Sequence, residues 1–291
     1  MSAMKPVSTF SIVALDPETG DLGVATASKF LAVGSVVPFA EAGLGAVATQ
    51  SYANTTFGPR TLMALRGGIS LELIAQAFAE SDAEHDQRQY GLVDVRGRAL
   101  TFTGEACHPW AGGKTGEGYA AQGNLLAGPE VVDALSKTFE GSSGPLSRRL
   151  LGALAAGDAA GGDKRGRQSA ALLVVREGGG YGGFNDRYLD LRVDDHPAPV
   201  GELGRLLTLH ELYFGRSSED DVLDIGGDVS RRLQRVLVRA GVLEGPREGW
   251  DDVSAAALRE LAGTVNLEER LLGDERVDRV VLRYLEEKYP G

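Results

Sequence analysis

Short apolar runs dominate the first two thirds of the chain, and many occur in pairs joined by turn residues. These runs predict strands over residues 9–16, 22–28, 35–40, 44–50, 90–95, 99–104, 119–126, 169–177 and 187–193. A periodicity near that of the α-helix predicts helices over residues 59–66, 71–80, 129–140, 145–156 and 200–214. Residues 169–175 carry no polar face, which is typical of a strand buried on both sides.

Strand pairs that alternate with helix pairs favour two stacked sheets with helices on both outer faces. We therefore predict an α+β fold for residues 1–216, a four-layer αββα sandwich. A polar segment, residues 215–221, ends this part of the chain. Beyond it we expect no strands, and three amphipathic stretches predict a small three-helix domain over residues 217–291.

Composition narrows the classes of function. The formal net charge of -11 excludes the basic face that a nucleic-acid or anionic-membrane partner requires. Cys107 is the only cysteine, so a disulfide within the chain and a thiolate zinc site are excluded. The N-terminal stretch lacks the apolar core of a secretion signal, and no run is long enough to span a membrane. We expect a cytoplasmic protein.

The first predicted hairpin brings chemically interesting residues together. If residues 17–20 form its loop, Asp16 pairs with Asp21, and counting back places Thr9 opposite Ser28. Cβ atoms of such a pair lie about 4.5–5.5 Å apart. Lys29 follows directly, so its ammonium group can lower a neighbouring pKa or hold an anion. Thr9, Ser28 and Lys29 are therefore the candidate catalytic residues.

Polar residues at the ends of other strands are candidates for binding a substrate; they are Gln50, Ser51, Asn54, Gly123, Asn124, Arg165 and Asp186. The first three follow an apolar strand and could contact a substrate or an oxyanion. Gly123 and Asn124 precede a proline-initiated helix, which favours an anion-facing loop. Arg165 lies in a charged loop, residues 162–169, directly before a buried strand. The alternatives are an ordinary polar loop for the first three, a helix-entry turn for Gly123 and Asn124, a solvated charged loop for Arg165, and a turn for Asp186.

Other motifs predict no further chemistry. Gly178, Gly180 and Gly183 match G-x-G-x-x-G, but they link two strands and open no helix, so a hairpin loop is favoured over dinucleotide binding. His196 follows two aspartates in a segment more typical of a turn than of a metal site. Cys107 and His108 are neighbours in a loop, where adjacent residues seldom form a thiolate pair. We expect no metal and no cofactor.

Several longer motifs carry a family resemblance. They include TFSIVALDPETGDLGVATASKFLAVGS, GAVATQSYAN, GEGYAAQGNLLAGPEVV and GDKRGRQSAALLVVREGGGYGGFNDRY. Through them, residues up to about 215 resemble an uncharacterised bacterial family with an N-terminal-nucleophile (Ntn) hydrolase-like fold. The tail resembles a peptidoglycan-binding-like helical domain, through Gly227, Val229, Leu233, Gln234, Leu237 and Gly241. A module for packing or dimerisation is an equal alternative for the tail.

The resemblance implies that Thr9 is a nucleophile whose own α-amine acts as the base. Eight residues precede Thr9, so this role requires cleavage of the Ser8–Thr9 bond, by the protein itself or by a protease, or translation that starts elsewhere. We therefore expect an Ntn-type amidohydrolase for a small amide or peptide-like substrate. The alternatives are a non-catalytic ligand-binding protein whose tail binds a partner or muropeptide, and an enzyme that uses Ser28 or Ser51 with Lys29. A homo-oligomer remains open.

Overall fold

The structure of this protein is a computed structural model that describes residues 7–290. It divides the chain into two compact units, residues 1–205 and residues 206–291. We call them the first and the second unit and describe each by itself.

The elements of the first unit follow the predicted order. Its strands are β1 (Thr9–Leu15), β2 (Leu22–Ser28), β3 (Pro38–Glu41), β4 (Gly45–Ser51), β5 (Arg88–Asp94), β6 (Ala99–Thr103), β7 (Gly112–Gly116), β8 (Tyr119–Gly123), β9 (Ser169–Val175) and β10 (Arg187–Val193). Its helices are α1 (Phe57–Arg66), α2 (Leu71–Ser81), α3 (Glu130–Glu140), α4 (Leu146–Ala159) and the first part of α5 (Pro199–Phe214). Short 3-10 turns occur at Val33–Ser35, His85–Gln87 and Tyr181–Gly183.

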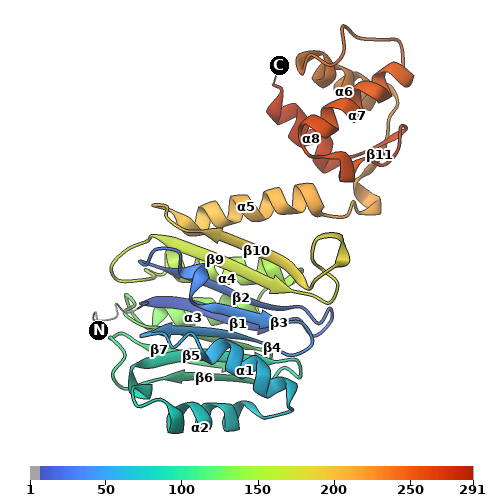
Figure 1. Ribbon diagram of the computed structural model, residues 1–291. Helices are drawn as coiled ribbons and strands as arrows, with labels where there is room; N and C mark the ends of the chain where they lie inside the picture. Colours follow the sequence, from blue (N-terminus) through green and yellow to red (C-terminus); the bar gives the residue numbers. More distant parts are fainter. Residues whose placement is uncertain (1–6, 291) are drawn as a thin grey trace. The chain divides into compact units, whose positions relative to one another are not determined.

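Two antiparallel sheets form the centre of the first unit (Figure 1). One has the strand order β10-β9-β2-β1-β8-β7, and the other has the order β3-β4-β5-β6. The sheets face each other, with β1 against β4 and β5 against β8. Helices α3 and α4 cover the outer face of the first sheet, and α1 and α2 cover the second. The predicted α+β fold, a four-layer αββα sandwich, is confirmed.

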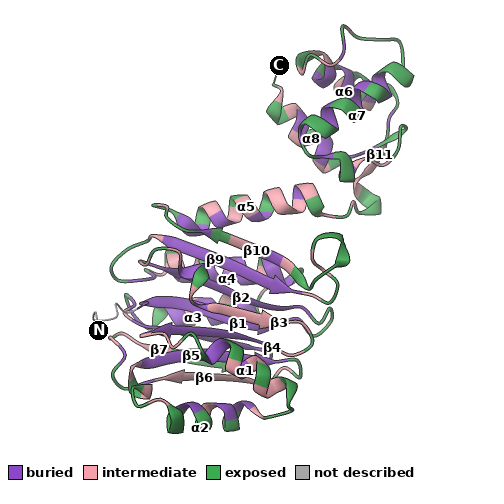
Figure 2. Ribbon diagram, viewed as in Figure 1, coloured by how far each residue is buried: buried purple, intermediate pink, exposed green. Residues whose placement is uncertain are grey.

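Successive side chains of β1 point to opposite faces of its sheet, and both faces of the strand are buried (Figure 2). Phe10 lies against Gly157 of α4, on the outer face of the sheet. Val13 and Leu15 point the other way and belong to the buried cluster between the sheets. Ser11 shares this inner face and hydrogen-bonds to Gln50 of the opposite sheet. The layer between the sheets is therefore apolar at one end and polar at the end where β1 begins.

Aromatic packing fixes the helices on the four-stranded sheet. The rings of Phe57 in α1 and Phe78 in α2 stack with centroids 3.8 Å apart, and both meet the edge of Tyr90 in β5. In α2, Leu71, Ile74 and Phe78 are buried, which is the apolar face that the periodicity predicts.

Two local differences from the predicted elements have simple causes. Strand β7 is not among the predicted strands, because the sequence GGKTG lacks alternating apolar residues. It forms an edge strand that pairs only with β8 in its sheet. The strand expected over residues 119–126 ends at Gly123, because Leu125 has a left-handed backbone with φ of 52°.

The second unit is a small helical unit with one feature that the sequence did not reveal. Its elements are the end of α5, β11 (Val222–Asp224), α6 (Gly227–Arg239), α7 (Asp252–Thr264), β12 (Arg276–Asp278) and α8 (Arg279–Lys288), with 3-10 turns at Glu219–Asp221 and Glu268–Arg270. Strands β11 and β12 form an antiparallel pair, so the expectation of no strands beyond residue 220 was wrong. Strands of three residues are too short for a period-two pattern to identify.

The tail motif residues serve packing within the second unit. Leu233 and Leu237 are fully buried in its core. The Gln234 side chain is also buried, accepts a hydrogen bond from Arg247 N at 2.9 Å, and donates to Gly249 O. Gly241 has φ of 77°, the left-handed conformation that commonly ends a helix.

The second unit includes part of α5. Leu212 belongs to its core, and Leu209 and Tyr213 pack against that core. The boundary that the sequence predicts, between residues 216 and 217, stays a prediction. Among the described residues, no helix is both long and apolar enough to cross a membrane.

Candidate functional site

The start of β1 is the centre of the candidate site. Strands β1 and β2 pair in the predicted register, with Thr9 opposite Ser28 and Leu15 opposite Leu22. Thr9 is 0% exposed and Ser28 is 2% exposed. The hydroxyl group of Thr9 donates a hydrogen bond to the carbonyl oxygen of Val7 at 2.9 Å. In the intact chain, Thr9 is therefore inaccessible to a substrate.

The peptide bond between Ser8 and Thr9 is held by two donors. The Ser8 carbonyl oxygen accepts a hydrogen bond from the hydroxyl group of Ser28 and another, at 3.2 Å, from Nη2 of Arg165. A hydroxyl and a cationic guanidinium that converge on one carbonyl oxygen stabilise negative charge on that oxygen. This carbonyl group directly precedes the Thr9 hydroxyl in the chain.

Asp163 fixes the position of Arg165. The Asp163 carboxylate, 1% exposed, accepts bonds from the Arg165 backbone N at 2.9 Å, from Nε at 3.1 Å and from Nη2 at 2.7 Å. It also accepts a bond from the backbone N of Lys29 at 2.9 Å. Several charge-assisted bonds to one buried carboxylate hold the guanidinium in a single orientation. The exposed Lys29 ammonium group donates to Arg167 O at 3.2 Å.

Buried amide side chains connect both sheets behind Thr9. The Nε2 of Gln50 donates to the Thr9 carbonyl oxygen at 3.2 Å and to Oε1 of Gln89 at 2.8 Å. The same Gln89 oxygen accepts from Nδ2 of Asn124 at 2.9 Å. The backbone N of Asn124 donates to Thr9 O at 3.0 Å. Because all three side chains are 0% exposed, these bonds replace water and hold Thr9 from both sheets.

The amide network extends along the inner face through Ser11 and Gln122. The Ser11 hydroxyl donates to Gln50 Oε1 at 2.6 Å and accepts from Gln122 Nε2 at 2.7 Å. Gly91 provides the space for this glutamine, since a Cβ atom there would lie 2.1 Å from Gln122 Oε1. The glycine in β5 is thus required by the polar layer between the sheets.

Two residues beside Thr9 adopt backbone conformations that are unusual for residues other than glycine. Ser51, at the end of β4, has φ of 66°, and Leu125, after β8, has φ of 52°. Such conformations cost free energy and often occur at functional sites. In addition, two buried side-chain oxygens, Ser8 Oγ and Asn124 Oδ1, have no hydrogen-bond partner within residues 7–290. Ser8 precedes Thr9 in the chain, and the backbone N of Asn124 donates to the Thr9 carbonyl oxygen.

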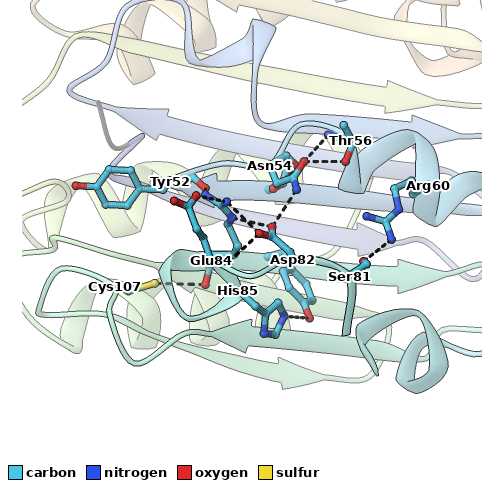
Figure 3. A network of polar contacts seen from close by, with 12 residues as sticks. Tyr52, Asn54, Thr56, Arg60, Ser81, Asp82, Glu84, His85 and Cys107 are labelled. Atoms are coloured by element: carbon cyan, nitrogen blue, oxygen red, sulfur yellow. Dashed lines mark hydrogen bonds and ion pairs between the residues drawn. The ribbon is translucent and has the colours of Figure 1, made fainter. Parts of the chain in front are cut away.

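A buried ion pair supports the neighbouring strand ends (Figure 3). The guanidinium of Arg88, the residue that pairs with Ser51, bonds to Asp82 at 2.9 Å and to the carbonyl oxygen of Tyr52 at 2.6 Å. The hydrogen bonds from Arg88 hold the pKa of the Asp82 carboxyl well below its usual range. Asn54 joins this network, since its Nδ2 donates to Asp82 at 2.9 Å. The network anchors the chain as it leaves β4.

Cys107 and His108 have different partners, as their position in a loop predicts. The buried Cys107 thiol donates to Arg88 O at 3.4 Å, and burial raises the pKa of this thiol. The His108 ring lies 3.3 Å, through Nε2, from the hydroxyl oxygen of Tyr52. A buried thiol with a raised pKa is a poor nucleophile.

The structure brings together most of the predicted site residues; Thr9, Ser28, Gln50, Ser51, Gly123, Asn124 and Arg165 all lie at this end of the sandwich. Lys29 adjoins them only through its backbone. Asn54 contributes to the Asp82 network instead.

Two predictions about binding residues need correction. Asp186 lies at the opposite end of the sheet, because β9 runs from Ser169, opposite Ser28, to Val175, opposite Leu22. Its carboxylate accepts from Gly178 N at 2.9 Å within the hairpin loop. The anion-facing loop expected at Gly123 and Asn124 is not formed, since the backbone N of Asn124 and those of residues 125–127 already donate to carbonyl oxygens.

The structure also contains a wide groove away from Thr9. A groove of about 1200 Å³ occupies the opposite end of the sandwich, where it is lined by the β1–β2 turn, Gly97, Tyr119 and Pro145. Within residues 7–290, no three His, Cys, Asp or Glu side chains are placed to hold a metal ion.

Sequence reasoning missed Ser11, Gln89 and Gln122. Each is a polar residue at an inward position of a buried strand, and a single polar residue in a strand gives no distinctive pattern. Their common partner, Gln50, was identified, but the opposite sheet that joins them could not be placed from the sequence.

Comparisons with known proteins agree with this architecture. The model of a family described as "Family of unknown function (DUF1028)" matches residues 9–203. A second, described as "Putative peptidoglycan binding domain", matches residues 213–285. A crystal structure of protein SPO2555 from Silicibacter pomeroyi, assigned to the DUF1028 family, is 34% identical with a TM-score of 0.65. That match covers 72% of this chain and 88% of the other. No curated protein matches.

Proposed function

This chain belongs to the DUF1028 family, whose function is unknown, and we propose that it is an Ntn-type amidohydrolase with Thr9 as its nucleophile. One observation carries the proposal: the Ser8 carbonyl oxygen lies between the Ser28 hydroxyl and the Arg165 guanidinium, directly before the hydroxyl of Thr9. Two donors on this oxygen would stabilise the oxyanion that forms when Thr9 attacks the Ser8 carbonyl carbon.

Cleavage would proceed by attack of Thr9 Oγ1 on the Ser8 carbonyl carbon. The new C–O bond forms as the carbonyl oxygen becomes an oxyanion, which Ser28 and Arg165 stabilise. The C–N bond then breaks, and the hydroxyl proton passes to the departing nitrogen. Water hydrolyses the resulting ester, which leaves a carboxylate on Ser8 and a free α-amine on Thr9.

The freed amine can serve as the general base. An α-amino group has an ordinary pKa of about 7.7–8.0, which suits proton transfer near neutral pH. Asn124 Oδ1, buried and unpartnered in the described chain, supplies an acceptor beside Thr9.

Substrate hydrolysis would repeat the same chemistry on an external amide. Thr9 Oγ1 attacks the amide carbon while the α-amine takes the hydroxyl proton, and that proton moves to the leaving amine as the C–N bond breaks. Water then hydrolyses the acyl-enzyme. Arg165 provides a cationic donor at the position of the reacting carbonyl oxygen, which suits a small amide or peptide-like substrate with a developing oxyanion.

The test is a screen of amide, lactam and muropeptide hydrolysis with protein that begins at Thr9. The screen runs beside Thr9→Ala and beside Thr115→Ala, a matched change on the exposed face of β7. We expect turnover that Thr9→Ala abolishes and Thr115→Ala retains. Undiminished turnover in Thr9→Ala would favour an internal serine. Ligand binding without any turnover would favour the non-catalytic alternative.

A further inference from the structure

Val7, two residues before Thr9, is held by a single β-bridge. Val7 and Ser51 form an antiparallel bridge: Val7 N donates to Ser51 O, and Ser51 N donates to Val7 O at 3.0 Å. A pair of backbone bonds of this kind recognises an extended peptide of any sequence. Ser51 has a left-handed backbone and is the last residue of β4, so the pairing is limited to this one bridge.

The two side chains before the proposed cleavage point are enclosed. Val7 is 5% exposed and belongs to the buried cluster between the sheets, with Val33 and Val37. Ser8 is 0% exposed, and its hydroxyl oxygen has no partner in the described part of the chain. The enclosed position of Ser8 thus accepts a small side chain but offers nothing to a hydroxyl group. Alanine would suit it at least as well as serine, since an unpaired buried hydroxyl is unfavourable.

From these contacts we propose that the slot filled by Val7 and Ser8 is the acyl-side subsite of the processed enzyme. This inference rests on the proposed function. The substrate class is a peptide-like amide whose acyl part ends in a β-branched apolar residue followed by alanine or serine. Its backbone pairs with Ser51, and its carbonyl oxygen lies between Ser28 and Arg165. In the intact chain, Val7 and Ser8 occupy the slot and keep the site closed.

The experiment measures the hydrolysis of peptide p-nitroanilides by protein that begins at Thr9. This protein is obtained by cleaving an N-terminal fusion partner directly before Thr9. Near-ultraviolet circular dichroism checks that this protein keeps the fold of the intact chain. The probes are acetyl-Val-Ala, acetyl-Gly-Ala, acetyl-Val-Leu and the reversed acetyl-Ala-Val. Burial of a valine side chain corresponds to about ten- to a hundredfold in affinity. We therefore expect kcat/KM for acetyl-Val-Ala to exceed that of each other probe at least tenfold.

A binding arm separates the subsite from the chemistry. Acetyl-Val-Ala with a free carboxylate is titrated calorimetrically into the same protein and into intact Thr9→Ala, whose slot stays filled. We expect saturable binding of acetyl-Val-Ala that is at least tenfold tighter than binding of acetyl-Gly-Ala to the same protein. We also expect acetyl-Val-Ala to bind the intact chain at least tenfold more weakly. Both results together support the subsite even without turnover. Turnover or acylation at Thr9 with no preference for valine would overturn the subsite and leave the nucleophile in place. No preference in either arm would also overturn it.

Discussion

Replacement of Gln89 by leucine tests whether the buried amide network holds the site together. Gln89 Oε1 accepts bonds from Gln50 and Asn124, and its Nε2 donates to Thr103 Oγ1 and to Gly123 O, each at 2.8 Å. Leucine fills a similar volume but provides neither donor nor acceptor. Gln50 keeps Thr9 O as an acceptor at 3.2 Å. The Asn124 amide loses its acceptor in a fully buried position.

The expected loss of stability follows from the buried polar groups that Gln89→Leu leaves unpaired. A buried donor without a partner costs about 1–3 kcal/mol, and the loss of the remaining bonds adds about 1 kcal/mol. We expect Gln89→Leu to lower the free energy of unfolding by about 2–4 kcal/mol. For a unit of this size, that corresponds to a fall in Tm of about 4–16 °C. Gln76→Leu, at an exposed position on α2, should change stability by less than about 0.5 kcal/mol.

The assay is urea unfolding followed by circular dichroism, with a double-mutant cycle between Gln89→Leu and Asn124→Leu. Because removal of both partners leaves no unpaired amide between them, the double variant should recover about 1–3 kcal/mol relative to the sum of the single changes. Unchanged stability in Gln89→Leu, or strictly additive effects, would refute the inference that these amides act as one network.

Three further outcomes are expected. Arg165→Met should slow cleavage of the Ser8–Thr9 bond about 10²–10³-fold, measured by mass spectrometry over time. The control Arg167→Met, which removes an exposed ion pair with Asp158, should leave the rate unchanged. Equal rates in the two variants would remove Arg165 from the site. The pKa of Asp82 is lowered on folding, so its stabilising contribution is present above pH 4 and is lost as the pH falls further. Asp82→Asn should therefore lower stability at pH 7 and flatten its loss between about pH 4 and pH 2, and an unchanged acid profile in urea unfolding would contradict this. A fragment of residues 1–216 should unfold cooperatively, although it exposes Leu212, and aggregation on purification would count against the predicted boundary.

The sequence predicted the fold because its strongest signals are local. The turn at residues 17–20 and the alternation on either side determined the register that places Thr9 opposite Ser28. The buried strand β9 followed from a continuous apolar run, and the amphipathic face of α2 followed from periodicity. Strands β7 and β11 were missed because one lacks apolar residues and the other has only three residues.

The site was predicted only in part because its main contacts are long-range. Arg165 was identified as one cation in a charged loop, but its bond to Ser8 O joins residues far apart in the chain. Gln89 and Gln122 gave no signal, since a single glutamine in a strand has no distinctive pattern until the opposite sheet is placed. Asp186 was a candidate only as a polar residue after a hairpin loop, and the register of β9 with β2 places that loop at the end of the sheet away from Thr9.

The central claim is that Thr9 becomes the N-terminal nucleophile of this protein. The most direct test is the intact mass of the purified protein over time, followed by peptide mapping after treatment with an acylating substrate analogue. We predict loss of residues 1–8, a new N-terminus at Thr9 and acylation of the Thr9 hydroxyl, all absent in Thr9→Ala and present in Thr115→Ala. A mass that stays full-length, with no acylation at Thr9 and with activity that Thr9→Ala retains, would contradict the claim.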